Sequence, residues 1–242
     1  VARSPGGTAA GLGVADGVYM WREKGIDAGA LSRALVQEAK AGVEAGETDV
    51  LALMRRSAAA VRSRGLQGSS TLCVLLVDLV EGRIHSGTLG DSGYMVLANL
   101  GSLGRSAGAD AVRYRTPQQE HEFGCPYQLG HHEGSSSVED AMLGTVPLQV
   151  GDVVVLGSDG LFDNVGDAEI ASFVGGCLAE MVTEPQAAVV RAMAQGLAAL
   201  AFEHSLSRDH PTPYARTATE HFDMVYNGGK KDDITVLVAI VD

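Results

Sequence analysis

The order of strand-like and helix-like patterns is the feature that most limits how this chain of 242 residues can fold. Apolar segments rich in β-branched residues, the pattern typical of strands, occupy residues 12–18, 71–79, 83–97, 152–157 and 234–241. Apolar residues at helical spacing occupy residues 28–45, 50–61, 170–181 and 187–202. The segment 83–97 is long enough for two strands, so strands are grouped with strands and helices with helices.

This grouping predicts an α+β fold, because a doubly wound parallel sheet requires strands and helices to alternate strictly. No internal repeat and no long low-complexity stretch divides the sequence, so we expect residues 1–242 to form a single domain. Residues 204–229 are polar, contain prolines and show little periodicity, and we expect them to form a long surface excursion.

The charge balance limits the possible partners. The chain has 18 Lys and Arg residues against 30 Asp and Glu residues, a net charge of −12. A protein that binds phosphate backbones needs an excess of cations, so nucleic acid and anionic membrane surfaces are poor partners. No apolar run approaches the ~20 residues that cross a bilayer, so we expect no membrane-spanning segment. The three cysteines are widely spaced and form no CxxC pair, which favours free thiols in an intracellular, reducing compartment.

Aspartates recur at the ends of the apolar strand segments, beside glycines that let the backbone turn sharply. The set consists of Asp16, Asp91, Asp159, Asp163, Asp232 and Asp233. Clustered carboxylates repel one another unless a cation neutralises them, and all-oxygen ligation favours Mg(II) or Mn(II) over zinc. A single Asp-Gly pair at a strand end is most often a turn, so the spacing by itself leaves turns and a metal site as alternatives.

Five strings carry a resemblance to a known family: GVADGV, GSSTLCVLLVD, TLGDSGYMVL, GSDGLFDNV and GGKKDDITVLV, in this order and at appropriate separations. They resemble the signature motifs of the metal-dependent type-2C (PPM) serine/threonine protein phosphatases, and the resemblance covers residues 11–241. Two further strings, TPQQEHEFGCPYQLG and HSLSRDHPTPYARTA, resemble an organellar subgroup found in mitochondria and chloroplasts, some of whose plastid members act on photosystem core proteins.

The resemblance implies a four-layer α-β-β-α sandwich of two antiparallel sheets flanked by helices, with metal ions at one edge between the sheets. Asp16 matches the aspartate that bridges two central Mg(II) or Mn(II) ions, and Gly17 matches a glycine that supplies a backbone carbonyl. Asp159 and Asp232 match the other ligands of this binuclear centre, so the implied catalytic residues are Asp16, Asp159 and Asp232. The implied reaction is one-step hydrolysis of phosphoserine or phosphothreonine by metal-activated water.

The same resemblance implies a third, weaker metal ion. Asp91 and Asp163 match the residues that hold it. Asp233 occupies a position where many relatives have Asn, which implies a supporting role.

The sequence departs from the family pattern in two places. Family members have an earlier strand whose acidic residue helps to hold a metal ion, and an upstream arginine that binds phosphate. The given sequence begins after both, so we expect that an N-terminal part with the first strand is omitted; a degenerate phosphatase is the alternative. Tyr19 and Met20 replace a glycine pair, and they either reshape the cleft or merely pack on Trp21.

Two hypotheses of function follow. The first is a Mg/Mn-dependent phosphatase of the organellar type, in a chloroplast or mitochondrion, that acts on phosphoprotein substrates. The second is a catalytically inactive pseudophosphatase that holds a partner protein or serves as a regulatory subunit. Lys230 and Lys231 are interpreted as solvated turn residues, Cys73 as a core residue, and Cys125 as the thiol best placed for a redox role.

Overall fold

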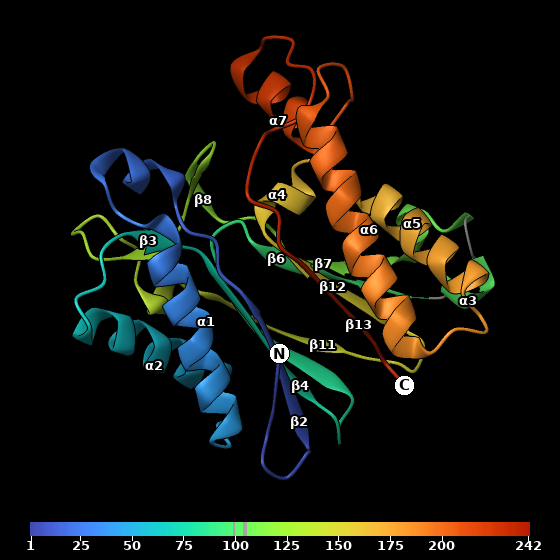
Figure 1. Cartoon of the computed structure of the whole chain (residues 1–242), viewed down its shortest axis with the longest axis horizontal. Helices are drawn as coiled ribbons and strands as arrows, with labels where there is room; N and C mark the ends of the chain where they lie inside the picture. Colours follow the sequence, from blue (N-terminus) through green and yellow to red (C-terminus); the bar gives the residue numbers. More distant parts are fainter. Residues whose placement is uncertain (99, 104–105) are drawn as a thin grey trace. The chain divides into compact units, whose positions relative to one another are not determined.

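The computed structural model describes residues 1–98, 100–103 and 106–242, which fall into two compact units (Figure 1). Unit 1 comprises Val1–Ser92 and Pro117–Leu148, and unit 2 comprises Gly93–Thr116 and Gln149–Asp242. Each unit is therefore built from two stretches of chain that are separated in the sequence. Each contains one main antiparallel sheet with helices packed on it.

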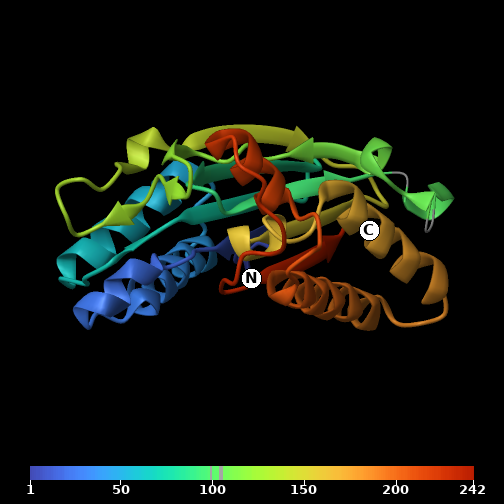
Figure 2. The ribbon, with the colours of Figure 1, turned by 90° about the horizontal axis from the view of Figure 1, so that it is seen from above.

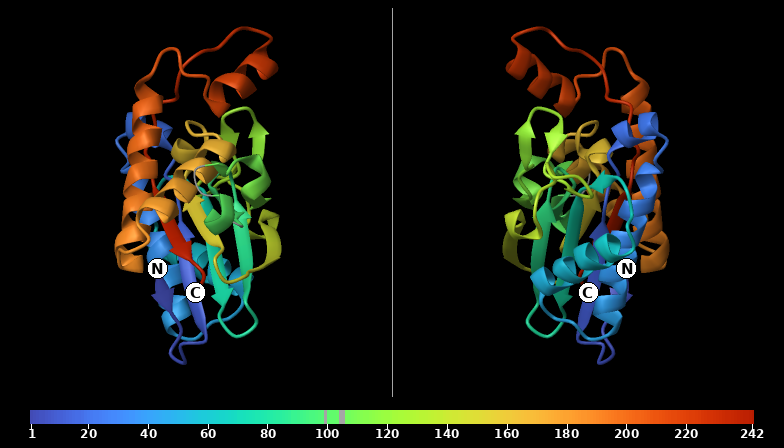
Figure 3. Two further views of the ribbon diagram at one scale, coloured as in Figure 1. Left: turned by 90° about the vertical axis from the view of Figure 1, so that its right-hand side faces the viewer. Right: turned by 90° about the vertical axis from the view of Figure 1, so that its left-hand side faces the viewer.

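The main sheet of unit 1 has the strand order β1-β2-β4-β5-β11, and every neighbouring pair is antiparallel. Its strands are β1 (Ala2–Arg3), β2 (Ala9–Val14), β4 (Leu72–Asp78), β5 (Arg83–Leu89) and β11 (Met142–Pro147). Two helices, α1 (Ala28–Glu44) and α2 (Val50–Ser63), pack on this sheet and are blue and cyan in Figure 3. Alternate residues of β4, Leu72, Val74 and Leu76, join Leu35 and Leu53 of the helices in one buried cluster, as a period of two requires.

Aspartates begin both helices of unit 1. Asp27 accepts a hydrogen bond from the backbone N–H of Gly29 at 2.9 Å, and Asp49 accepts one from that of Leu51 at 2.8 Å. Each carboxylate thus satisfies an amide that has no partner inside its helix. The shorter elements of this unit are η1 (Tyr19–Lys24), β3 (Ser69–Ser70), β8 (Glu120–Glu122), β9 (Cys125–Pro126), β10 (Leu129–Gly130) and η4 (Val138–Asp140).

The main sheet of unit 2 has the order β13-β12-β6-β7, again antiparallel throughout. Its strands are β6 (Gly93–Leu97), β7 (Val112–Arg115), β12 (Val153–Gly157) and β13 (Val236–Ile240). Its helical elements are α3 (Leu100–Leu103), η3 (Ala109–Ala111), α4 (Asp159–Phe162), α5 (Asp167–Glu180), α6 (Gln186–Leu206) and α7 (Pro213–Phe222). Figure 2 shows α5 and α6 next to each other, and Val153 and Val155 share a buried cluster with residues of both helices.

The predicted α+β fold class with two antiparallel sheets and packed helices is confirmed. Three details differ from the sequence-based expectation. The strand expected at residues 12–18 is β2, which spans Ala9–Val14, because the chain leaves the sheet before Gly17, which bridges to Ser70. The strands β7 and β11 were not expected, and the stretch 204–229 contains the helix α7. Among the described residues, no helix is both long enough and apolar enough to cross a membrane.

Candidate metal centre

Three of the predicted acidic residues converge on one ammonium group in unit 2. The Nζ atom of Lys230 lies 2.5 Å from Oδ2 of Asp159, 2.8 Å from Oδ2 of Asp163 and 3.1 Å from Oδ2 of Asp232. The side chains of Asp159 and Asp163 are only 10% and 15% exposed. A charged cluster that is this well shielded from water is held together by its opposite charges.

The neighbours of Lys230 and Asp232 shift the pKa of each group. Burial lowers the pKa of Lys230, but the charges of Asp163 and Asp159 outweigh burial and raise this pKa above its ordinary value. Burial raises the pKa of Asp232, and the neighbouring charge of Asp159 raises it further, while Lys230 lowers it in part. The carboxylates therefore still repel one another, because a single ammonium does not neutralise all three.

The side chain of Asn164 fixes the segment that carries Lys230. Asn164 is fully buried, and its amide group donates hydrogen bonds to the backbone carbonyls of Gly160 and Lys230, each at 2.9 Å. Its carbonyl oxygen accepts a hydrogen bond from the backbone N–H of Lys230 at 3.0 Å. One amide side chain thus ties the turn after α4 to a segment 66 residues further along the chain.

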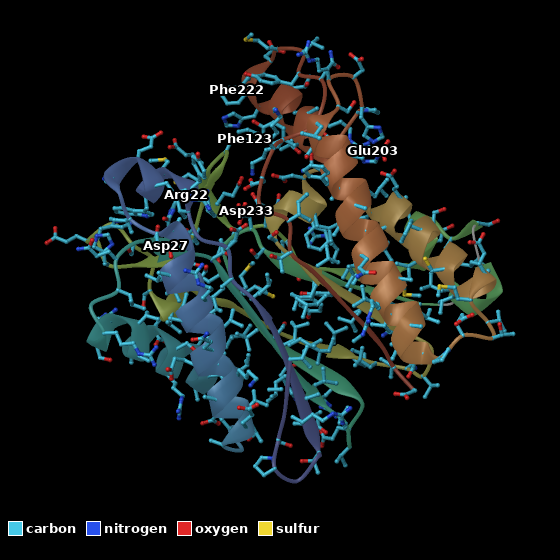
Figure 4. All side chains as sticks on the ribbon, in the orientation of Figure 1. Arg22, Asp27, Phe123, Glu203, Phe222 and Asp233 are labelled. Carbon is cyan, nitrogen blue, oxygen red and sulfur yellow. The ribbon has the colours of Figure 1, made fainter. Side chains whose placement is uncertain are left out.

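Ser158 makes a second tie between the same two segments. Its hydroxyl donates to the backbone carbonyl of Asp233 at 3.1 Å and accepts from the N–H of Thr235 at 3.1 Å. Asp233, labelled in Figure 4, lies on the segment that leads into β13. A Cβ atom on Gly160 would lie 2.4 Å from the carbonyl oxygen of Asp233, so the close approach of the two segments requires glycine here.

In unit 1, Asp16 and Asp91 follow β2 and β5 at the same edge of the sheet, because both strands are antiparallel to β4. Thr71, just before β4, lies between them. Its hydroxyl accepts a hydrogen bond from the backbone N–H of Asp16 at 3.1 Å and lies 2.8 Å from the hydroxyl of Ser92. The backbone N–H of Thr71 also donates to the carbonyl of Asp16 at 2.9 Å.

Close packing explains the glycines beside these two acids. A Cβ atom on Gly17 would lie 2.0 Å from the carbonyl oxygen of Ala28 in the first turn of α1. Gly90 has a φ of 105°, and a Cβ atom there would lie 2.6 Å from the carbonyl oxygen of Tyr127. Both positions therefore exclude any side chain, independently of a metal ion.

The structure brings the predicted site residues together in two groups, one in each unit. Asp159, Asp163 and Asp232 share Lys230 in unit 2, while Asp16, Gly17 and Asp91 lie at one sheet edge of unit 1. The interpretation of Lys230 as a solvated turn residue was wrong, since its side chain is 28% exposed and makes three ion pairs. Its neighbour Lys231 is exposed, as expected.

Four residues outside the predicted site had other predicted roles. Cys73 is fully buried in β4, which confirms its interpretation as a core residue. Cys125 is half-buried in β9, and its redox role stays a prediction. Tyr19 and Met20 are 64% and 70% exposed, so most of each side chain is open to solvent.

The donor set in unit 2 fits a hard divalent cation. Asp159, Asp163 and Asp232 offer only carboxylate oxygens, the ligands that Mg(II) and Mn(II) prefer. When these three are ionised, Lys230 leaves two of the negative charges uncompensated, which is the charge of one such ion. The acidic residues of unit 2 that were predicted to bind metal therefore carry an excess of negative charge.

Comparison with known proteins identifies the family, although no family model matches the chain. The probable protein phosphatase 2C 55 of Arabidopsis thaliana is 35% identical over 233 residues, which cover 95% of this chain and 45% of that protein. The protein phosphatase PTC7 homolog fig of Drosophila virilis is 35% identical over 244 residues, which cover 96% of this chain and 74% of that protein. The chain thus spans less than half of the first relative and about three quarters of the second.

Two solved structures share the fold. The photosystem II phosphatase PBCP is 30% identical with a TM-score of 0.80, and the match covers 98% of this chain and 92% of that chain. The catalytic domain of the serine/threonine protein phosphatase PstP, in complex with two manganese ions, is 20% identical with a TM-score of 0.57 and covers 97% of this chain and 88% of that chain.

These similarities and the acidic cluster define a protein serine/threonine phosphatase, which is the predicted class of enzyme. The chain belongs to the type-2C protein phosphatases, the family to which its motifs pointed. Its relatives include PTC7 homologs, and it shares its fold with the photosystem II phosphatase.

Proposed function

We propose that the chain hydrolyses phosphoserine and phosphothreonine in proteins with the help of Mg(II) or Mn(II). The observation that carries this proposal is the convergence of Asp159, Asp163 and Asp232 on Lys230, which leaves an excess of negative charge with hard oxygen donors only. The manganese ions in the related PstP structure support the choice of cation.

In this proposal residues 1–242 act as one catalytic domain. Asp16 from unit 1 and Asp159 and Asp232 from unit 2 hold two ions, and Gly17 contributes its backbone carbonyl. Asp91 and Asp163 hold a third, weaker ion. When bound, the metal ions supply a water of lowered pKa for attack on phosphorus.

The residues of the chain have their own tasks beside the ions. Asn164 and Ser158 fix the backbone on either side of Asp232 and so orient its carboxylate toward Asp159. Lys230 neutralises part of the acidic charge and thereby limits the repulsion among the ligands. Such pre-organisation reduces the reorganisation that binding and reaction would otherwise require.

We place the substrate and the compartment with the organellar subgroup. The 30% identity to a photosystem II phosphatase supports a phosphoprotein substrate in a plastid, and a mitochondrial location is the second option within that subgroup. The resemblance of the strings at residues 116–130 and 204–218 supports the same subgroup.

Phosphate release from a phosphothreonine peptide tests the proposed activity. We expect phosphate release with Mn(II) or Mg(II) and none with EDTA. The Asp159→Asn variant should release phosphate at least about 1,000-fold more slowly, which corresponds to an increase of about 4 kcal/mol in the activation free energy. Asp110→Asn is the matched control, because Asp110 is an exposed aspartate of the same unit, and it should retain full activity.

Full activity in Asp159→Asn would overturn the assignment of this residue. No release with any ion, in a chain shown to be folded, would contradict the proposal and favour a non-catalytic role in holding a partner protein.

A further inference from the structure

A second cluster of possible metal ligands lies in unit 2, outside the carboxylate centre. Glu169 in the first turn of α5, His204 in the last turn of α6 and His210 just after α6 each offer one ligand atom, and these atoms lie within 4.8 Å of one another. Glu203, labelled in Figure 4, marks this end of α6. His204 is 8% exposed, whereas the side chain of Glu169 is 39% exposed, so solvent reaches the cluster at Glu169.

A hydrogen bond sets the tautomer of His204. Its Nδ1 atom lies 3.0 Å from the backbone carbonyl oxygen of Asn164. A carbonyl oxygen only accepts, so Nδ1 carries the hydrogen, and in the neutral ring the lone pair is on Nε2. A metal-ligating histidine is commonly oriented in this way, with its other nitrogen donating to a backbone carbonyl.

The free nitrogen of His204 faces the carboxylate of Glu169. Nε2 of His204 and Oε1 of Glu169 are 3.7 Å apart, which is too long for a hydrogen bond between them. With the neutral ring, these are two lone-pair atoms, which repel unless a proton or a metal cation lies between them. Two ligands of one tetrahedral zinc ion are about 3.3 Å apart, given zinc–ligand distances of about 2.0 Å, so the observed gap is close to that of a metal site.

His210 supplies the third donor. Its ring stacks on that of His204 with the centroids 3.6 Å apart and the planes at 24°. Its backbone N–H donates to the hydroxyl of Ser207 at 3.0 Å, which holds the residue next to the end of α6. The three donors therefore come from two helices and the turn that follows one of them.

We propose that Glu169, His204 and His210 form a binding site for a zinc-type divalent ion, distinct from the carboxylate centre. Two imidazoles and one carboxylate suit Zn(II), whereas Mg(II) prefers oxygen ligands throughout, so the two sites differ in the ion that they select. The exposed side of Glu169 leaves room for a water as fourth ligand. The site also contacts the carboxylate centre through one residue, because Asn164 accepts from His204 and holds the backbone of Lys230.

Metal counting tests this site without reference to activity. The full chain is loaded with Zn(II), dialysed against excess Mg(II), and its bound zinc is measured. Glu169→Gln and His210→Gln should each lose one equivalent of zinc, or bind it at least about tenfold more weakly. Both residues are less buried than His204, so these variants leave the buried His204 in place.

His85→Gln is the matched control, because His85 lies in β5 of unit 1 and bonds to Thr145. It should keep the zinc that the other two variants lose. Asp159→Asn should also keep this equivalent, which separates the site from the carboxylate centre and the outcome from that of the phosphatase assay.

A titration with Co(II) provides the second measurement. Co(II) in the wild-type site should show the visible absorption of a nitrogen-ligated, four-coordinate ion, and His210→Gln should lose it. Equal zinc content in the wild type, Glu169→Gln and His210→Gln would overturn the proposal. The three side chains would then be an ordinary His–Glu ion pair with a stacked ring.

Discussion

In unit 2 the carboxylates of Asp159, Asp163 and Asp232 surround an ammonium group, whereas in unit 1 the strand end that carries Asp16 is held by neutral hydroxyls. The first arrangement depends on charge and on a buried amide clamp. The second depends on the backbone of Asp16 and the hydroxyl of Thr71. Both place acidic residues at a sheet edge, but they do so at different energetic cost.

The difference shows that acidic residues can be positioned in two ways. Where several carboxylates meet, repulsion must be offset inside the protein, and Lys230 does this before any ion binds. At the end of β2, hydrogen bonds between the backbone of Asp16 and Thr71 fix the position of the acid. Three substitutions separate these two ways of holding acids, and we expect their effects to decrease in the order in which they follow.

Lys230→Met should have the largest effect, because it removes the ammonium that pairs with three carboxylates. We expect a loss of about 3 kcal/mol in the free energy of unfolding in EDTA, the size typical of breaking a buried ion pair. Mg(II) should restore part of this loss, since a divalent cation replaces the missing charge. Urea denaturation with EDTA and with Mg(II) measures both quantities.

Lys231→Met is the control for that experiment, because Lys231 is the exposed neighbour of Lys230. It should leave the unfolding free energy within about 0.5 kcal/mol of the wild type in both buffers. If Lys230→Met were as stable as the wild type in EDTA, the ammonium would not be what holds the three acids together.

Asn164→Ala should have the second largest effect. It removes three hydrogen bonds and leaves the backbone groups of Lys230 and Gly160 without these partners in a buried place, at a cost of about 2–3 kcal/mol. Unfolding of Asn227→Ala, an exposed asparagine shortly before the same segment, provides the matched comparison. An equal stability of the two variants would show that the clamp contributes nothing.

Thr71→Val should have the smallest effect, about 1 kcal/mol, because it removes one neutral hydroxyl that serves the N–H of Asp16. Thr88→Val is its control in the same unit, since the hydroxyl of Thr88 makes only a long bond of 3.4 Å. A loss in Thr71→Val as large as that in Lys230→Met would remove the contrast between the two units.

Continuous apolar runs made most strands of the sheets predictable. Segments such as those of β4 and β12 have few alternative structures, because they are apolar on both faces and bounded by turn residues. The helix α7 was not predicted, because its buried side consists of the small residues Ala215 and Ala218 and so shows no strong apolar periodicity. Thr212 as N-cap and Pro213 at the first helical position were the available signal.

The acids of the site were predictable for a similar reason, because each follows or precedes an apolar strand. The role of Lys230 was not predictable, because two adjacent lysines in a glycine-rich turn look equally solvated in the sequence. Its partner Asp159 lies 71 residues away, and only the fold decides which of the two lysines faces it. Local patterns therefore identify the acidic residues but not the counter-charge.

The tie between Asn164 and Lys230 also has a consequence for how the protein is made. During synthesis a chain leaves the ribosome N-terminus first, so Asp159 and Asp163 emerge before Lys230, Asp232 and β13. Asp159 is therefore without the ammonium of Lys230 until 71 further residues have been added, and its repulsion with Asp163 is uncompensated during that time. We expect this part of unit 2 to reach its final arrangement only after Lys230 has emerged, with β13 pairing with β12 as a late step.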